Sequence, residues 1–174
     1  MKPFIGIKKI WYGDVITAAV TKTSLKTWLG TATEVENSHQ DTWAYTEDDP
    51  TYTDYINELN GSIYYRDVTQ KGAKTISFTM GVFSLDDKVE LEGGEKVDTD
   101  AGWASSDTPG IVNKAIVGQT KTGNYIVFTN AAVIAKGNAV EKNIGLGVTA
   151  VAMENPNSGV KSDYLFDGEK VEAA

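Results

Sequence analysis

The sequence predicts a mainly β protein: a β-sandwich or barrel with one short flanking α-helix and a long loop or arm. Short runs of β-branched and aromatic residues recur along the whole chain, and several alternate between apolar and polar positions. Only one stretch carries clear signals for both the start and the end of a helix. The 174 residues suit a single domain over residues 1–174, which is large enough to bury a core.

The first third of the chain predicts one strand and then a long excursion. Phe4–Gly13 is rich in β-branched and aromatic residues and ends in Gly-Asp, whereas Val15–Gly30 has no spacing that separates helix from strand. Residues 31–61 are acidic and lack a period, so we expect an extended loop or arm there. The aromatic residues within it indicate that it orders against another surface. The candidate residues for an assembly interface are Trp43, Tyr45, Asp48, Asp49, Tyr52 and Tyr55.

The middle of the chain predicts a hairpin followed by the single helix. Ser62–Phe83 reads as two strands that turn at Gln70–Gly72. Ser84 and Asp87 then form an S-x-x-D capping box, and Gly93 can take the left-handed conformation that closes a helix. A helix of about eight residues is too short to be stable alone, so it must pack on a sheet.

The second half predicts three more strands. Gly110–Gln119 and Asn124–Gly137 flank a hairpin turn, and Asn143–Glu154 follows after Gly137 and Asn138. In this last strand one face is apolar and the other carries small residues, so we expect core on one side and a second surface on the other. The tail, residues 167–174, is polar and is expected to fray.

Charge and composition exclude several classes of protein. The net charge is −8, and no Lys or Arg lies between Lys26 and Arg66, so the acidic surface argues against gripping nucleic acid. The absence of cysteine excludes disulfides and thiolate metal sites. No run of about 18 apolar residues predicts a membrane span, and the N-terminus lacks the features of a secretory signal. We therefore expect the chain to be used where it is made, without crossing a membrane.

Motifs that suggest chemistry are weak. His39 lies beside Ser38 and near Asp41, but adjacent side chains point apart and no G-x-S-x-G elbow presents a nucleophile. The stretch 98–107 resembles a Ca²⁺ loop but lacks its closing Glu. We expect no enzyme activity, cofactor or dedicated metal site. A pair of carboxylates acting as a hydrolase, or exposed aromatic residues binding carbohydrate, stay as alternatives.

Several segments taken in order resemble the major tail tube protein of long-tailed phages. These segments are "TISFTMG" with the capped helix and "ELEGG", Trp103, "NKAIVGQTKTGNYIVFTNAAVIAKG" and "KNIGLGVTAVAMENP". The stretch "HQDTWAYTEDDPTYTDYINELNGSIYY" is similar to tail tube proteins of phages and prophages of gut Bacteroidetes. The resemblance covers residues 4–166 and depends on the order and spacing of the segments.

The resemblance implies a structural virion protein without catalytic residues. Its copies would form hexameric rings whose inner sheets join into one barrel, and the rings would stack into a conduit for DNA ejection. Its partners would be further copies of itself, the tape measure and tail terminator proteins and a sheath where one exists, with DNA passing through without specific binding. Its location would be the phage tail, after synthesis in the bacterial host cytoplasm. Tube or ring proteins of type VI and contractile injection systems are the closest alternative.

The acidic arm then has an expected role. Its aromatic residues suit contacts between stacked rings, and the negative charge would keep DNA from adhering to the wall. Deleting Asp41–Pro50 is expected to leave a folded subunit that no longer polymerises.

Overall fold

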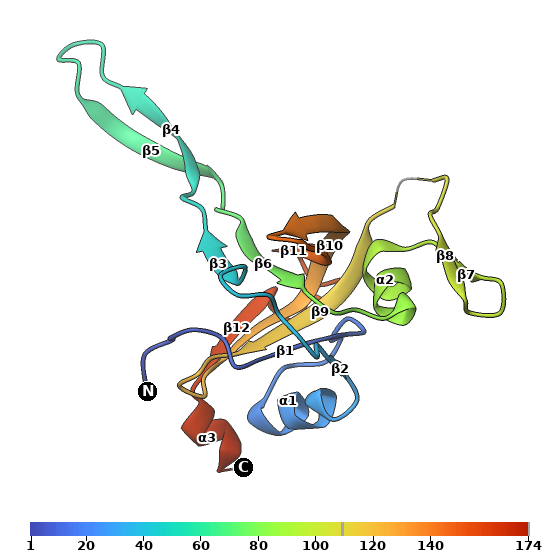
Figure 1. Cartoon of the computed structure of the whole chain (residues 1–174). Helices are drawn as coiled ribbons and strands as arrows, with labels where there is room; N and C mark the ends of the chain where they lie inside the picture. Colours follow the sequence, from blue (N-terminus) through green and yellow to red (C-terminus); the bar gives the residue numbers. More distant parts are fainter. Residues whose placement is uncertain (109, 174) are drawn as a thin grey trace.

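An antiparallel sheet of eight strands forms the body of the molecule in the computed structural model, which describes residues 1–108 and 110–173 (Figure 1). The strand order is β2–β1–β9–β10–β11–β6–β3, and β12 also pairs with β10. Two hairpins, β4–β5 and β7–β8, form separate small sheets. The strands are β1 (Lys9–Gly13), β2 (Thr33–Glu34), β3 (Ala44–Glu47), β4 (Thr51–Ile56), β5 (Ile63–Gln70), β6 (Lys74–Met80), β7 (Glu95–Val97), β8 (Gly102–Ala104), β9 (Val112–Gln119), β10 (Tyr125–Val140), β11 (Asn143–Ala152) and β12 (Asp163–Phe166).

The predicted mainly β fold with a flanking helix and a projecting arm is confirmed. In the described part of the chain the large sheet is open: its strand order runs from β2 to β3, and these two end strands do not pair with each other to close a barrel. Three short helices flank the sheet where one was predicted: α1 (Lys22–Leu29), α2 (Leu85–Glu92) and α3 (Gly168–Glu172).

The long strand β10 organises the sheet. Its first residues, 125–128, pair with β12, and residues 131–140 pair with β11. A bulge between Phe128 and Ala131 separates these two halves, as expected where a strand changes partner and bends. The strand predicted to end at Gly137 is longer than expected, because β10 continues to Val140.

Two clusters of buried side chains occupy opposite faces of the sheet. The first cluster includes Phe78, Phe128 and Leu146 and is covered by α2 through Leu91. The second lies on the alternate positions of β1, β9 and β10 and is covered by α1 and α3 through Leu25 and Val171. Alternation along each strand therefore places apolar side chains on both faces at one end of the sheet.

Local signals account for the ends of α2. The Ser84 hydroxyl accepts a hydrogen bond from the Asp87 backbone N–H at 3.1 Å, and the Asp87 carboxylate accepts one from the Ser84 backbone N–H at 2.7 Å, so the predicted capping box is confirmed. Gly93 has the expected positive φ, 89°, but its ψ of −163° differs from the left-handed helical conformation. The buried Tyr12 hydroxyl donates to the same Asp87 carboxylate at 2.5 Å, which fixes α2 against β1.

The segment after β2 links the two ends of the sheet. The backbone N–H of Val35 donates to Ile10 O in β1, whereas the N–H of His39 donates to Thr79 O in β6. Ser38 forms an isolated bridge with Met80. The chain thus passes from one edge of the curled sheet to the other before it enters β3.

Three further expectations were wrong. Residues 31–61 are not one loop: the arm is the hairpin of β4 and β5, which turns at residues 57–62. Strand β5 pairs with β4 and not with β6, so residues 70–72 connect two sheets instead of turning a hairpin. The tail from residue 168 forms α3, in which Val171 is buried and the Glu172 carboxylate accepts a hydrogen bond from the Tyr125 hydroxyl at 2.7 Å.

Candidate assembly interface

The arm, defined as the β4–β5 hairpin from Thr51 to Gln70, projects away from the body of the molecule (Figure 1). Eight of the seventeen large exposed apolar side chains of the described residues lie on it. They are Tyr52, Tyr55, Ile56, Leu59, Ile63, Tyr64, Tyr65 and Val68. This concentration of exposed apolar side chains makes the arm the candidate for an interaction surface.

The arm has few interactions of its own. Tyr55 and Tyr65 pair across the strands with ring centroids 5.7 Å apart, and Arg66 lies over the Tyr52 ring while it binds the Asp54 carboxylate at 2.6 Å. The hydrogen bond from Arg66 lowers the pKa of the Asp54 carboxyl. Every residue of β5 is exposed. Since an isolated two-stranded hairpin is at best marginally stable in water, the arm needs a surface to pack on.

The predicted interface residues are divided between the core and the arm. Trp43 and Tyr45 pack against the first core cluster, and Tyr45 contacts Phe128 with ring centroids 6.3 Å apart. Burial, with the nearby Glu47 carboxylate, raises the pKa of Tyr45. Asp48 and Asp49 are exposed where the arm begins, and Tyr52 and Tyr55 lie on the arm, with 53% and 44% of their surface exposed.

Sequence reasoning missed the arm residues after Ile56. The signal for them was present: Asn60 and Gly61 lie between Ile56 and Ile63, and Asn-Gly between apolar residues is a strong hairpin signal. The turn is closed by hydrogen bonds from the backbone N–H groups of Gly61 to Asn57 O and of Asn57 to Ser62 O.

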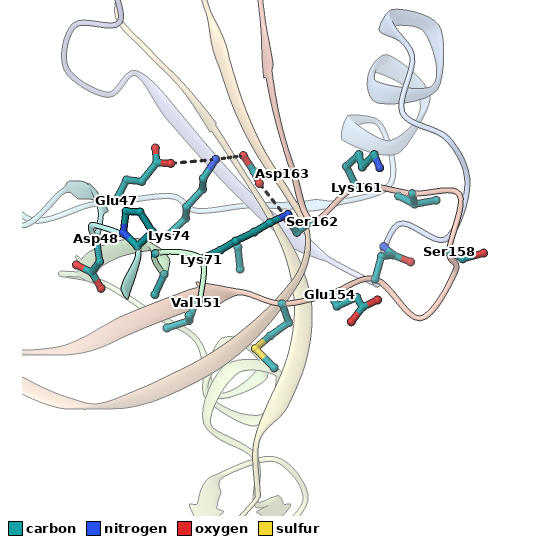
Figure 2. Close-up of a pocket in the computed structure, with 17 residues that line it drawn as sticks. Glu47, Asp48, Lys71, Lys74, Val151, Glu154, Ser158, Lys161, Ser162 and Asp163 are labelled. Carbon is teal, nitrogen blue, oxygen red and sulfur yellow. Dashed lines mark hydrogen bonds and ion pairs between the residues drawn. The ribbon is translucent and has the colours of Figure 1, made fainter. Parts of the chain in front are cut away.

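A polar groove of about 950 Å³ lies at the base of the arm, between residues 71–74 and the loop before β12 (Figure 2). Lys74 binds the Asp163 carboxylate at 2.7 Å and the Glu47 carboxylate at 3.4 Å across it. The hydrogen bond to Asp163 raises the pKa of Lys74. These ion pairs connect the start of β6 to β12 and β3, so they fix the position from which the arm leaves the body.

The four strands β10, β11, β6 and β3 form a second candidate surface. Their first face carries core residues, whereas most described positions of their other face are exposed or half-buried, with Thr79 and Gly145 buried. Register places Ile134, Thr149, Ser77 and Ala44 in one row across this face. Lys136, Gly147 and Thr79 form the next row, and together with Thr42 and Asn138 they line a shallow hollow of about 470 Å³. We call this surface the small-residue face.

Both ends of this four-stranded unit are free edges. Among the described residues β3 pairs only with β6. The last pair between β10 and β9 is Val133 with Val112, so within the described residues β10 has a strand partner on one side only beyond Val133. A sheet with unpaired backbone groups at both ends is a template for pairing with another chain.

The acidic residues do not lie on the small-residue face. Lys136 is its single charged residue among the described strand positions, and it is exposed. The strands of the small-residue face therefore give no support to the expectation that negative charge lines the wall of a DNA conduit. The acids lie instead on and just before the arm and near α2 and β7.

Residues considered for chemistry do not come together. The His39 ring nitrogen Nδ1 lies 3.1 Å from Gln40 O, and the buried Ser38 hydroxyl has no hydrogen-bond partner in the described parts of the chain. Within residues 1–108 and 110–173 no three His, Asp or Glu side chains gather as a metal site requires. In the same residues no helix has the length and apolarity to cross a membrane.

No family model matches this chain, and no curated protein matches it either.

Proposed function

We propose that this chain is a self-assembling structural protein, the major tail tube subunit of a long-tailed phage or prophage. The observation that carries the proposal is the four-stranded unit β10–β11–β6–β3, which has core on one face, small residues on the other and a free edge at each end. The exposed arm adds a second surface that requires a partner.

The two free edges differ, which determines what they can build. Pairing the β3 edge of one copy with the β10 edge of the next is a head-to-tail contact, and such contacts generate rings when the rotation closes. In a ring the four-stranded units would continue as one sheet, with the helices outside and the small-residue face inside. Both open edges of the four-stranded unit would then be paired, which removes the liability that these two edges carry in the isolated subunit.

The dimensions of such a ring suit a conduit. Six copies, the number implied by the resemblance, would bring together about 24 strands spaced about 4.8 Å apart, which gives a backbone diameter of about 37 Å before strand tilt widens it. Barrels of about 16–18 strands already enclose a water-filled channel.

The chemistry of the small-residue face suits passage rather than binding. It presents hydroxyls, glycines, the exposed Ile134 and one lysine per copy, and its described strand positions carry neither acids nor an array of basic side chains. Since retention of DNA depends mainly on neutralising many phosphates, a wall of this kind would hold passing DNA weakly. The tape measure and tail terminator proteins, and a sheath where one exists, are the further proposed partners, and the virion tail is the proposed location.

Electron microscopy of the purified chain at high concentration tests the assembly. Six-fold rings or tubes are the expected result. A persistent monomer that binds sugars would overturn the proposal in favour of a carbohydrate-binding module. A tube protein of an injection system would assemble in the same way and is distinguished by where the native particle is found.

A disulfide test addresses the seam between copies. The chain has no cysteine, so Thr46→Cys on β3 and Asn138→Cys on β10 can be introduced together on the small-residue face. Within one subunit β3 and β10 are three strand spacings apart, about 14 Å, beyond the reach of a disulfide. Oxidation should therefore produce a ladder of covalent oligomers that ends at the hexamer.

The single variants Thr46→Cys and Asn138→Cys are the matched controls and should give at most dimers. Because the register between copies is not fixed by one subunit, Lys136→Cys and Val140→Cys on β10 complete the set. Absence of a ladder from every pair, in samples whose rings are seen by microscopy, would show that these edges do not form the seam.

A further inference from the structure

The charge of the chain is divided between two regions. Residues 1–30 contain five lysines and one acid, Asp14, whereas residues 31–73 contain nine acids against Arg66 and Lys71. The basic block and the acidic block follow each other directly in the chain. Whether their charges neutralise each other therefore depends on where the fold places them. Only one ion pair joins the two blocks among the described residues, Lys9 with Glu34 at 2.9 Å.

The start of the acidic block, β2, pairs with β1, whereas the arm lies at one end of the molecule and α1, α3 and the N-terminal segment lie at the other (Figure 1). Backbone and side-chain hydrogen bonds gather the second end: Lys121 N–H donates to Ile5 O, Gly168 N–H donates to the Asn124 side chain, and Lys26 Nζ donates to Glu172 O. We call this region the basic end.

Four lysines of the basic end are exposed and form no ion pair within the described chain. They are Lys8, Lys22, Lys121 and Lys170. Two of the acids nearby are paired with positive charges, because Glu169 binds Lys2 at 3.0 Å and Asp167 lies 3.6 Å from the N-terminal ammonium. Glu172 accepts a hydrogen bond from the neutral Tyr125 hydroxyl and keeps its negative charge, so one acid stands against the four lysines. The basic end therefore presents uncompensated positive charge.

The arm and the residues just before it carry negative charges that are likewise exposed and unpaired among the described residues. Glu58 and Asp67 on the arm, and Asp48 and Asp49 just before it, are exposed and have no ion-pair partner among residues 1–108 and 110–173. Apolar side chains accompany the charges at both ends. Leu59 is 94% exposed at the tip of the arm, and Met1 and Ile5 are 76% and 56% exposed at the basic end.

We infer that the acidic arm of one copy docks on the basic end of a second copy in the next ring. The inference rests on the proposed tube function and names the surface that receives the arm. The arm and the basic end are different surfaces at opposite ends of the molecule, so the contact is head-to-tail and propagates without closing, which is the geometry of a filament or tube. The apolar residues supply affinity, and the charges set the direction in which rings stack.

Charge reversal at each end tests the inference. The arm variant carries Glu58→Lys and Asp67→Lys, and the basic-end variant carries Lys121→Glu and Lys170→Glu. Each variant alone should form rings but need a protein concentration at least about tenfold higher to stack them into tubes, because like charges would meet at the contact. All four side chains are exposed, so circular dichroism should show folded protein in each case.

Mixing the two variants is the decisive measurement. Rings of the arm variant and rings of the basic-end variant present opposite charges to each other, so the mixture should form tubes near the wild-type concentration. The matched control for the arm variant is Glu95→Lys with Asp107→Lys, which changes the net charge by the same amount as the arm variant, at exposed positions away from both ends, and should stack like the wild type.

The outcomes separate the inference from the proposed function. Failure of the wild-type chain to form rings or tubes would reject the proposed function. Tubes from the wild type, without rescue in the mixture, would reject the docking site and leave the tube function standing. Stacking by either variant at the wild-type concentration would also reject it. Raising the salt from 0.05 M to about 1 M shortens the Debye length to about 3 Å and should weaken stacking more than ring formation.

Discussion

Replacing the arm residues 52–69 with Asn-Gly should abolish assembly and leave the body folded. Thr51 and Gln70 are paired across the hairpin, so their Cα atoms lie about 5 Å apart and a two-residue turn can join them. The replaced residues all belong to the hairpin, and neither core cluster includes any of them. Their removal therefore takes no side chain from the core.

The expected effect on stability is small. Shortening the connection from 18 residues to two lowers the entropy cost of loop closure by about 2 kcal/mol. This value is the upper limit of the expected increase in the free energy of unfolding. The free energy of unfolding should therefore stay within about 2 kcal/mol of the wild-type value, a change of about 4–8 °C in melting temperature at this chain length.

The expected effect on association is large. If each of the eight apolar side chains buries about 50 Å² in the assembly, the arm contributes about 10 kcal/mol per copy before the costs of association. Even if ordering and desolvation offset most of this, a remainder of about 3 kcal/mol changes the required concentration by about 100-fold. Tubes should be absent at concentrations where the wild-type chain assembles completely.

Sedimentation velocity and negative-stain microscopy report assembly, and a thermal melt followed by circular dichroism reports folding. The matched control replaces the loop of the β7–β8 hairpin, residues 98–101, with Asn-Gly between the paired residues Val97 and Gly102, and should assemble normally. Tubes formed by the arm variant at the wild-type concentration would refute the role of the arm. A melting temperature lowered by much more than 8 °C would refute its independence from the core.

Three further predictions follow from the core. Tyr12→Phe removes the hydrogen bond to the Asp87 carboxylate and should lower the free energy of unfolding by about 1.5–3 kcal/mol, measured by urea titration. Burial raises the pKa of both Tyr12 and Tyr125 above the ordinary value of 10.0. As the pH rises above 10, the unfolded chain loses these protons before the folded chain does, so the free energy of unfolding should fall. Equal urea midpoints at pH 9 and pH 11 would contradict this. Tyr45→Ala should lower the free energy of unfolding by about 2–4 kcal/mol, because Tyr45 packs on the core. Tyr64→Ala, on the exposed arm, should change it by less than about 0.5 kcal/mol and weaken only assembly. Similar losses of stability in the two variants would contradict the division between core and arm.

The earlier expectation for deleting Asp41–Pro50 changes for the same reason. That deletion removes β3 with Trp43 and Tyr45, so we now expect it to destabilise the subunit as well as to stop polymerisation. The aromatic residues of this stretch were predicted as one group, but the structure divides them at Asp48, because residues before it pair with β6 and residues after it pair with β5.

Features that depend on neighbours in the chain were predictable. The Ser84–Asp87 capping box, the β9–β10 hairpin and the alternation along β11 each follow from residues a few positions apart, and each is present. A cap or a tight turn is stabilised by local hydrogen bonds, so its sequence signal is nearly sufficient.

Features that depend on distant partners were not predictable from the pattern. Residues 62–70 carry the same alternation whether they pair with β4 or with β6, and the choice of β4 leaves the arm outside the core. Likewise α1 and α3 have weak signals of their own and are helical where Leu25 and Val171 can cover the second cluster.

The sequence alone thus predicted a mainly β chain, a capped helix, an acidic and aromatic segment and the absence of a strong catalytic motif. The tertiary structure decided which aromatic residues are exposed, which strand edges are free and where the two blocks of opposite charge lie. Pairing and burial bring together residues far apart in the chain, and hydrophobic burial is non-directional, so no local pattern specifies which distant surface each segment meets.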